Sequence, residues 1–148
     1  MEFPNQESLD FLAALGKTPD YGLPKWMIFA HFCHESFYFK RRAGLHNFMF
    51  LVKPSGWDGL VAVSVDKDGG KSKEFVDFVT IDEMIFYYLN YVKTIFPGVM
   101  KCKDCSTCFA WALENWNDTG IYPRQLIELL KFLQGEEEVT LAFDRLVP

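Results

Sequence analysis

The sequence predicts an α+β fold in one domain that spans residues 1–148, with an antiparallel β-meander of three to five strands packed against three to five helices. Three observations support this prediction. Phe- and Val-rich segments lie close together in the middle of the chain, turn-forming residues separate them, and segments with helical periodicity follow. Strands grouped together and helices grouped together are typical of α+β proteins. A chain of this length can bury one core of ordinary size.

The chain begins with a predicted short helix. Over residues 5–15, Leu9 and Leu12 lie at helical spacing, and Gly16 follows as a stop signal. Residues 16–24 are dense in Pro and Gly and therefore predict a loop.

The next segment has two interpretations. Apolar residues at helical spacing predict a helix over residues 24–34, and the composition of residues 36–40 then predicts a strand. A single helix that runs to Arg42 and ends at Gly44 fits the same residues. The pattern alone does not decide between the two.

The middle of the chain supplies the predicted meander. Residues 47–53, 60–66 and 74–79 are rich in Phe and Val, and the segments between them have the composition of turns. Within the second strand, alternation predicts that one set of side chains points to the core: Val61, Val63 and Val65.

Helices are predicted for most of the remaining chain. Thr80 and Glu83 have the spacing of a capping box, which predicts a helix from there to residue 96. Further helices are expected over residues 106–116 and from residue 123 to Gly135. The apolar residues 139–143 are expected to add a last strand to the sheet.

Charge and aromatic content bear on function. The net charge is −5, yet residues 25–73 carry eight Lys or Arg against four acids, so the middle of the chain is basic. Net acidity argues against general binding to phosphate backbones, which needs surplus cations. Aromatic residues make up 17% of the chain, more than a core of this size obviously requires. Surplus rings are often binding anchors, and a Phe-rich core explains the same aromatic content equally well.

These features favour a small non-enzymatic module that binds another protein, as an inhibitor or an adaptor. The predicted binding residues combine a Trp at a hairpin tip with a basic cluster and a nearby ring: Trp57, Lys40, Arg41, Arg42 and Tyr38. The sequence is also compatible with a homo-oligomer. Nucleic-acid binding through residues 40–73 is a weaker alternative.

A cluster of cysteines supports a rival interpretation. Cys102, Cys105 and Cys108 follow two consecutive C-x-x-C spacings, and zinc needs four ligands of this kind. Cys33 is the predicted fourth ligand, with the nearby histidines His31, His34 and His46 as alternatives. Small buried core thiols explain the same spacing, because Cys is among the most buried residue types. A permanent disulfide is not expected in an intracellular protein.

Residues 31–35, which include His31, Cys33, His34 and Glu35, contain several groups that could act as nucleophile or base. Neighbouring residues point in different directions, so Cys33 and His34 are poorly placed to act on each other. We therefore assign no catalytic residue from the sequence. A small enzyme or zinc-stabilised protein remains the rival to the binding module.

The sequence also gives an expected location. Glu2 and Pro4 stand where a signal peptide would carry positive charge and an apolar run, and no apolar stretch approaches the ~20 residues that cross a bilayer. The prediction is a cytoplasmic protein, or a nuclear one in a eukaryotic host.

Overall fold

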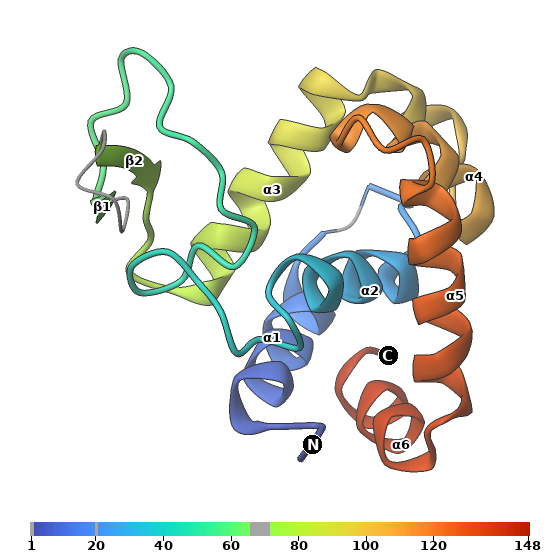
Figure 1. The fold of residues 1–148 in the computed structure, drawn as a ribbon. Helices are drawn as coiled ribbons and strands as arrows, with labels where there is room; N and C mark the ends of the chain where they lie inside the picture. Colours follow the sequence, from blue (N-terminus) through green and yellow to red (C-terminus); the bar gives the residue numbers. More distant parts are fainter. Residues whose placement is uncertain (1, 20, 66–71) are drawn as a thin grey trace.

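Six α-helices and one small hairpin make up the regular structure of the parts of the chain that the computed structural model describes, residues 2–19, 21–65 and 72–148. The helices are α1 (Gln6–Lys17), α2 (Lys25–Glu35), α3 (Ile81–Ile95), α4 (Ser106–Ala112), α5 (Tyr122–Gly135) and α6 (Glu137–Leu146). The strands are β1 (Val61–Val65) and β2 (Ser72–Val76), and two 3-10 helices are η1 (Pro97–Lys101) and η2 (Glu114–Trp116). Figure 1 shows the hairpin on one side of the molecule, the other helices on the opposite side, and α3 running between them.

The predicted meander is wrong, because the described residues hold only a two-stranded sheet. β1 and β2 pair antiparallel with Val61 opposite Val76. Val61 and Val63 are exposed, at 41% and 62%, so the alternation does not place them in the core. The turn predicted at residues 66–71 lies outside the described residues.

Residues 47–53, predicted as a strand, form irregular chain held by one buried amide. The Asn47 side chain donates to the carbonyl oxygens of Leu51 (3.0 Å) and Val76 (2.8 Å). Its own oxygen accepts from the amides of Met49 and Leu51. The Asn47 side chain thus occupies backbone groups that would otherwise pair between strands. The apolar residues of this segment therefore pack without forming a strand. A single bridge from Val52 to β2 is the remnant of sheet pairing.

The predicted strand at 139–143 is also wrong, because these residues lie in α6. Val139, Ala142 and Phe143 are buried while Leu141 is 61% exposed. Spacings of three and four residues between buried positions belong to one helical face. The segment therefore covers the core as an amphipathic helix.

The helices were predicted more accurately than the strands. The helix predicted over residues 24–34 is confirmed as α2, and the capping box is confirmed at the start of α3, where the Glu83 amide donates to the Thr80 hydroxyl. α5 also matches its prediction. The helix expected over 106–116 is divided into α4 and η2.

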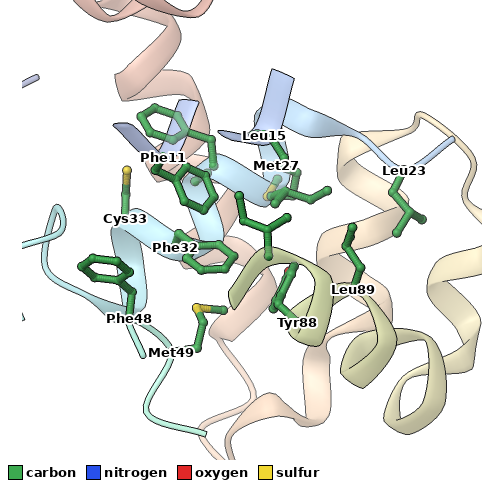
Figure 2. Packing of buried hydrophobic residues seen from close by; sticks show 14 of the residues in the cluster. Phe11, Leu15, Leu23, Met27, Phe32, Cys33, Phe48, Met49, Tyr88 and Leu89 are labelled. Carbon is green, nitrogen blue, oxygen red and sulfur yellow. The ribbon is translucent and has the colours of Figure 1, made fainter. Parts of the chain in front are cut away.

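The aromatic residues fill the core. Phe11, Phe29, Phe32, Phe48 and Phe109 are all fully buried. Figure 2 shows Phe32 of α2 between Phe11 of α1 and Tyr88 of α3. The Phe32 ring lies 4.4 Å from that of Phe11 and 4.8 Å from that of Tyr88, measured between centroids. Much of the aromatic surplus is thus core material and not a set of binding anchors.

No helix in the described part of the chain is long and apolar enough to cross a membrane.

Candidate active site

Glu35 is the last residue of α2 and its side chain is half-buried. The hydroxyl of Tyr122, which begins α5, donates a hydrogen bond to Oε1 of this carboxyl group. Tyr122 is itself buried. A residue from α5, 87 positions further along the chain, therefore fixes the orientation of the carboxyl at the end of α2.

The chain directly after Glu35 adopts an uncommon conformation. Phe37, Tyr38 and Phe39 have φ angles of 49°, 59° and 64°, values that cost roughly 1–2 kcal/mol each for residues other than glycine. The prediction of a strand at residues 36–40 and that of a helix continuing to Arg42 are both wrong for this reason. Backbone strain of this kind clusters at functional sites.

Hydrogen bonds hold this strained turn in place. The Ser36 hydroxyl donates to the Phe32 carbonyl (2.6 Å) and accepts from the Phe39 amide (2.7 Å). The side-chain amide of Asn5, which caps α1, donates to the Tyr38 carbonyl (2.9 Å). The turn is therefore anchored to both α2 and α1, which keeps the end of α2 rigid.

His31 lies one helical turn before Glu35 and is fully buried. Its Nδ1 is 2.7 Å from the hydroxyl oxygen of Tyr88 in α3. Its ring packs edge-on against Trp116 (4.4 Å between centroids) and Tyr122 (5.8 Å). Residues four apart share one face of a helix, so His31 and Glu35 belong to a single cluster with these rings.

Burial and the Glu35 charge shape the protonation of this cluster. Burial lowers the pKa of His31 well below its ordinary value, and the charge of His34 lowers it further. Burial raises the pKa of Tyr88 and Tyr122, and the nearby Glu35 carboxylate raises both further. At neutral pH the cluster thus holds a neutral imidazole and two neutral phenols.

A groove of about 950 Å³ runs along the outer face of α3. Aromatic rings form part of its wall, with polar and charged residues at the rim: Trp57, Phe78, Phe86, Tyr87, Tyr91, Asp82, Glu83 and Asn90. Glu35 is not among its lining residues. The groove and the Glu35 cluster are joined through Tyr91, whose ring lies 5.8 Å from that of Trp116.

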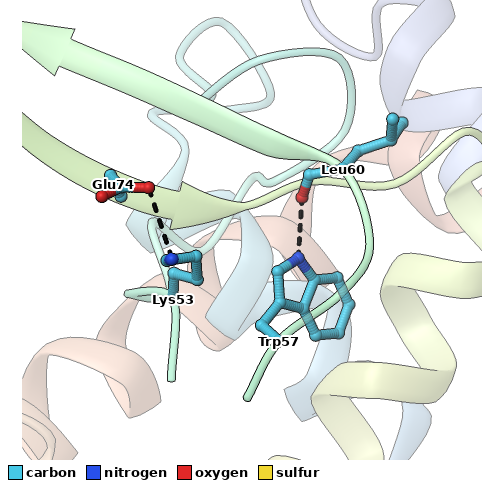
Figure 3. Close-up of polar contacts among 4 residues, drawn as sticks. All are labelled: Lys53, Trp57, Leu60 and Glu74. Atoms are coloured by element: carbon cyan, nitrogen blue, oxygen red, sulfur yellow. Dashed lines mark hydrogen bonds and ion pairs between the residues drawn. The ribbon is translucent and has the colours of Figure 1, made fainter. Parts of the chain in front are cut away.

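The residues predicted to bind a partner protein are not brought together with Trp57. Lys40, Arg41 and Arg42 are exposed just after the strained turn, and the two guanidinium groups lie over Phe37 and Phe48. Trp57 is half-buried against Phe78 and Tyr87, and its Nε1 donates to the Leu60 carbonyl (2.8 Å), beside the ion pair of Lys53 and Glu74 (Figure 3). Tyr38 packs against Phe3.

The predicted metal ligands are placed differently from one another. Cys102 and Cys108 form a disulfide, contrary to the expectation of reduced thiols. Cys105 is exposed at the start of α4. Cys33 is buried in α2, and burial raises the pKa of its thiol well above the ordinary value. Within the described residues, no group of three ligating side chains is arranged to hold a metal ion.

The sequence draws attention to His31 and Glu35 but not to Tyr88 and Tyr122. We considered residues 31–35 as neighbours in the sequence, and so did not note that His31 and Glu35, four residues apart, share one face of a helix. Tyr88 looks like an ordinary core position of a helix, and Tyr122 like the start of one. The available signal was the charged Glu35 at the end of an otherwise apolar helix, where a carboxylate lies near the unfavourable negative end of the helix dipole.

Known proteins resemble this chain in fold but not in sequence. No family model matches the sequence, and no curated protein sequence matches it. Solved structures do match its fold. The glycoside hydrolase domain of FlgJ from Salmonella typhimurium has a TM-score of 0.71 at 20% identity, over 93% of this chain and 96% of that chain.

Two further structures show the same likeness. The peptidoglycan hydrolase from Sphingomonas sp. A1 has a TM-score of 0.70 at 15% identity, over 95% of this chain and 94% of that chain. The catalytic domain of the autolysin Auto from Listeria monocytogenes has a TM-score of 0.61 at 11% identity, over 96% of this chain and 90% of that chain. The chain therefore has a mainly helical, lysozyme-like fold with one antiparallel hairpin.

This fold overturns the prediction of a small non-enzymatic protein-binding module, whether inhibitor or adaptor. The chain has the fold of glycoside and peptidoglycan hydrolase catalytic domains. The rings that suggested binding anchors largely fill the core. A carboxylate site that is built from distant elements leaves no contiguous motif in the sequence, so the lack of such a motif did not argue against an enzyme.

Proposed function

We propose that the chain is a glycoside hydrolase that cleaves peptidoglycan, with Glu35 as the general acid. The observation that carries this proposal is the half-buried carboxyl group of Glu35 at the end of α2, which the Tyr122 hydroxyl orients through a hydrogen bond. The strained turn that follows Glu35 supports it, as does the likeness to three hydrolase domains.

The chemistry of glycoside hydrolysis assigns a role to Glu35. Cleavage passes through an oxocarbenium-like transition state, and an acid must protonate the leaving oxygen. With Oε1 engaged by Tyr122, we assign Oε2 to carry this proton.

A second carboxylate is needed to activate water or to attack the sugar. Asp77 does not fit this role, because its oxygens accept from the amides of Leu45, His46 and Phe78. Among the described residues of β1 and β2, Glu74 is the acidic one, and its exposed side chain lies 3.4 Å from Nζ of Lys53. Glu35 bonds Tyr122 and Glu74 pairs with Lys53, so nothing among the described residues brings Glu74 to the Glu35 site, and we leave the second carboxylate unassigned.

The test of Glu35 uses purified bacterial peptidoglycan and measures the release of reducing sugar ends. Glu35→Gln keeps the shape and the Tyr122 contact but has no proton to donate. General acid catalysis contributes typically ~10²–10⁴-fold, so we expect the rate to fall by at least about 100-fold. Circular dichroism of the variant should match that of the parent chain.

The matched control is Glu128→Gln on α5, where the glutamate is exposed and pairs with Lys131. This variant should retain full activity. Release of peptides without new reducing ends would show cleavage of amide bonds and would contradict the proposal. Full activity in Glu35→Gln would contradict the assigned role.

A further inference from the structure

A cavity of about 240 Å³ lies between the hairpin and the loop that follows the strained turn. The hairpin contributes residues 62–64 and Phe75 to its lining, and Ala62 lies opposite Phe75 in the sheet register. Residues 42–44 and Phe50 contribute the rest. Sites for drug-sized ligands measure roughly 300–1,000 Å³, so this cavity suits a small chemical group and not a disaccharide.

The loop at residues 42–44 is held in place from behind. The buried carboxylate of Asp77 accepts hydrogen bonds from the amides of Leu45 and His46, at 2.9–3.1 Å. Gly44 has a φ of 62°, and a side chain at this position would collide with the Asp77 carboxylate. The wall of the cavity is therefore formed before any ligand binds.

Phe50 presents its ring to this cavity from a strained backbone. Its φ is 53°, which costs roughly 1–2 kcal/mol for a residue other than glycine. Its ring is 37% exposed and packs edge-on against Phe75, with 6.0 Å between the centroids. Burial in the core does not offset the strain, and strain of this kind clusters at functional sites. The position of Phe50 therefore points to a ligand that covers its ring.

Two cations flank the cavity, and neither pairs with a carboxylate in the described part of the chain. Arg42 lines the cavity, and its guanidinium carbon lies 5.8 Å from the centroid of the Phe48 ring. Nζ of Lys73 lies 5.6 Å from the centroid of the Phe75 ring. The ion pairs found among the described residues involve other side chains. A guanidinium without a partner offers a planar fork that binds a carboxylate through two parallel hydrogen bonds.

We propose that this cavity binds a small group that bears a carboxylate, with Arg42 as the anion receptor and the rings of Phe50 and Phe75 as apolar walls. The inference rests on the proposed cleavage of peptidoglycan, in which peptides attached to the sugar strand carry free carboxylates beside small aliphatic side chains. The loop at residues 42–44 continues from the turn after Glu35, so neighbouring segments of the chain would bind the sugar and the peptide. The protein therefore selects sugar strands that bear peptides over bare strands.

The experiment titrates the protein with three soluble probes and follows its backbone amide signals by NMR. The first probe is a peptidoglycan disaccharide that carries its peptide, the second is the same disaccharide without the peptide, and the third carries the peptide with its carboxyl groups amidated. The first probe alone should move the signals of Gly44 and Ala62. It should bind at least about 10-fold more tightly than the other two, because a hydrogen-bonded carboxylate is lost in both.

Variants of the cavity test the assigned residues. Arg42→Gln should bind the first probe no more tightly than the bare disaccharide, and Arg42→Lys, which keeps the charge without the fork, should retain part of the difference. Phe50→Gly suits the left-handed backbone, so the fold is kept while the loss of the ring weakens binding. Arg145→Gln is the matched control, because Arg145 is exposed on α6, which packs on α1 and α5.

The outcomes separate this site from the proposed function. Preference for the first probe that depends on Arg42, without release of reducing ends from peptidoglycan, would support the site and refute only the proposed function. Equal binding of the three probes, no binding of any, or an Arg42→Gln variant that binds like the parent chain would overturn the inference, even if the chain cleaves peptidoglycan.

Discussion

Ser36 holds the end of α2 through both the donor and the acceptor capacity of its hydroxyl. It is fully buried, donates to the Phe32 carbonyl and accepts from the Phe39 amide. Without it, the amide of Phe39 would be buried with no partner at a position where the backbone is already strained. Ser36 therefore stabilises the turn that fixes Glu35.

We expect Ser36→Ala to lower the free energy of unfolding by about 1–3 kcal/mol, because a buried amide loses its acceptor. Urea denaturation measures this change. Ser55→Ala, in an exposed loop position, is the control and should change stability by less than about 0.5 kcal/mol. Equal stability of the two variants would mean that the hydroxyl does not support the turn.

His31 gives the protein a pH dependence of stability. Its pKa in the folded chain lies well below the value of 6.5 that applies when it is exposed. Below pH 6.5 the unfolded chain therefore binds a proton that the folded chain does not. Stability is fully present above this pH and falls as the pH drops toward the folded pKa, by up to about 1.4 kcal/mol per unit.

Replacing His31 by Leu should remove this contribution. Denaturation in urea at a series of pH values from 7 to 5 should show a steeper loss of stability for the parent chain than for His31→Leu. The absolute stability of the variant is not the criterion, since the loss of the bond to Tyr88 lowers it at every pH. Parallel curves would contradict a neutral buried His31.

At the scale of elements, α3 connects the hairpin side of the molecule to the helical side (Figure 1). Its first turn is capped by Thr80, whose hydroxyl accepts from the Glu83 amide at 3.2 Å, and Glu83 in turn accepts from the Val79 amide. Its buried face contributes Met84, Tyr88 and Val92 to the core. The cap therefore supports the helix that also carries Tyr88.

We expect Thr80→Ala to cost about 1 kcal/mol, the usual effect of losing an N-cap. Thr80→Ser keeps the hydroxyl and is the matched control, with stability close to that of the parent chain. Thermal unfolding followed by circular dichroism compares the three proteins. An equal loss in both variants would point to the threonine methyl group and not to the cap.

Helices could be predicted from this sequence because their periodicity and caps are local. α3 and α5 follow directly from spaced apolar residues and stop signals, whereas the end of α2 was left open between residues 34 and 42. The strands could not, because a β-rich composition at 47–53 is overridden by the Asn47 side chain, which bonds to residues as far away as Val76. Short apolar runs such as residues 139–143 fit both the helical and the strand periodicity. Whether such a run forms a helix or a strand depends on the elements that it packs against.

The candidate site was predicted only in part. His31 and Glu35 attracted attention as ionisable residues in an apolar segment, but Tyr88 and Tyr122 come from α3 and α5, which lie far along the chain from α2. No local pattern shows that these helices meet there. The left-handed turn at residues 37–39 has no glycine to announce it, so composition indicated a strand instead.

At the scale of the whole molecule, one covalent cross-link joins the end of η1 to α4. The bond between Cys102 and Cys108 closes a loop of only six residues' separation. A disulfide stabilises a protein by restricting its unfolded chain, and this effect grows with the length of the closed loop. For a loop this short, we expect about 2 kcal/mol of free energy of unfolding. The cross-link therefore adds local support near α3 and α5 but does not connect the two sides of the molecule.

We expect a variant with Cys102→Ser and Cys108→Ser to lose roughly 2 kcal/mol of free energy of unfolding. It should therefore unfold at a lower temperature than the parent chain. Cys105→Ser, at an exposed position, should leave the unfolding unchanged. Thermal melts of the parent chain with and without reductant provide the same comparison without mutation. A parent chain whose melt is insensitive to reductant would contradict the contribution of the disulfide.

The Asn5 side chain has a consequence for how much of the chain the site requires. It caps α1 and also donates to the carbonyl of Tyr38. Phe3 stacks on Phe29 and packs edge-on against Tyr38. A shortened chain that begins at Gln6 would retain each of Glu35, His31, Tyr88 and Tyr122. It would nevertheless lose the outer brace of the turn at residues 37–39, so the opening residues belong to the candidate site as much as these four side chains do.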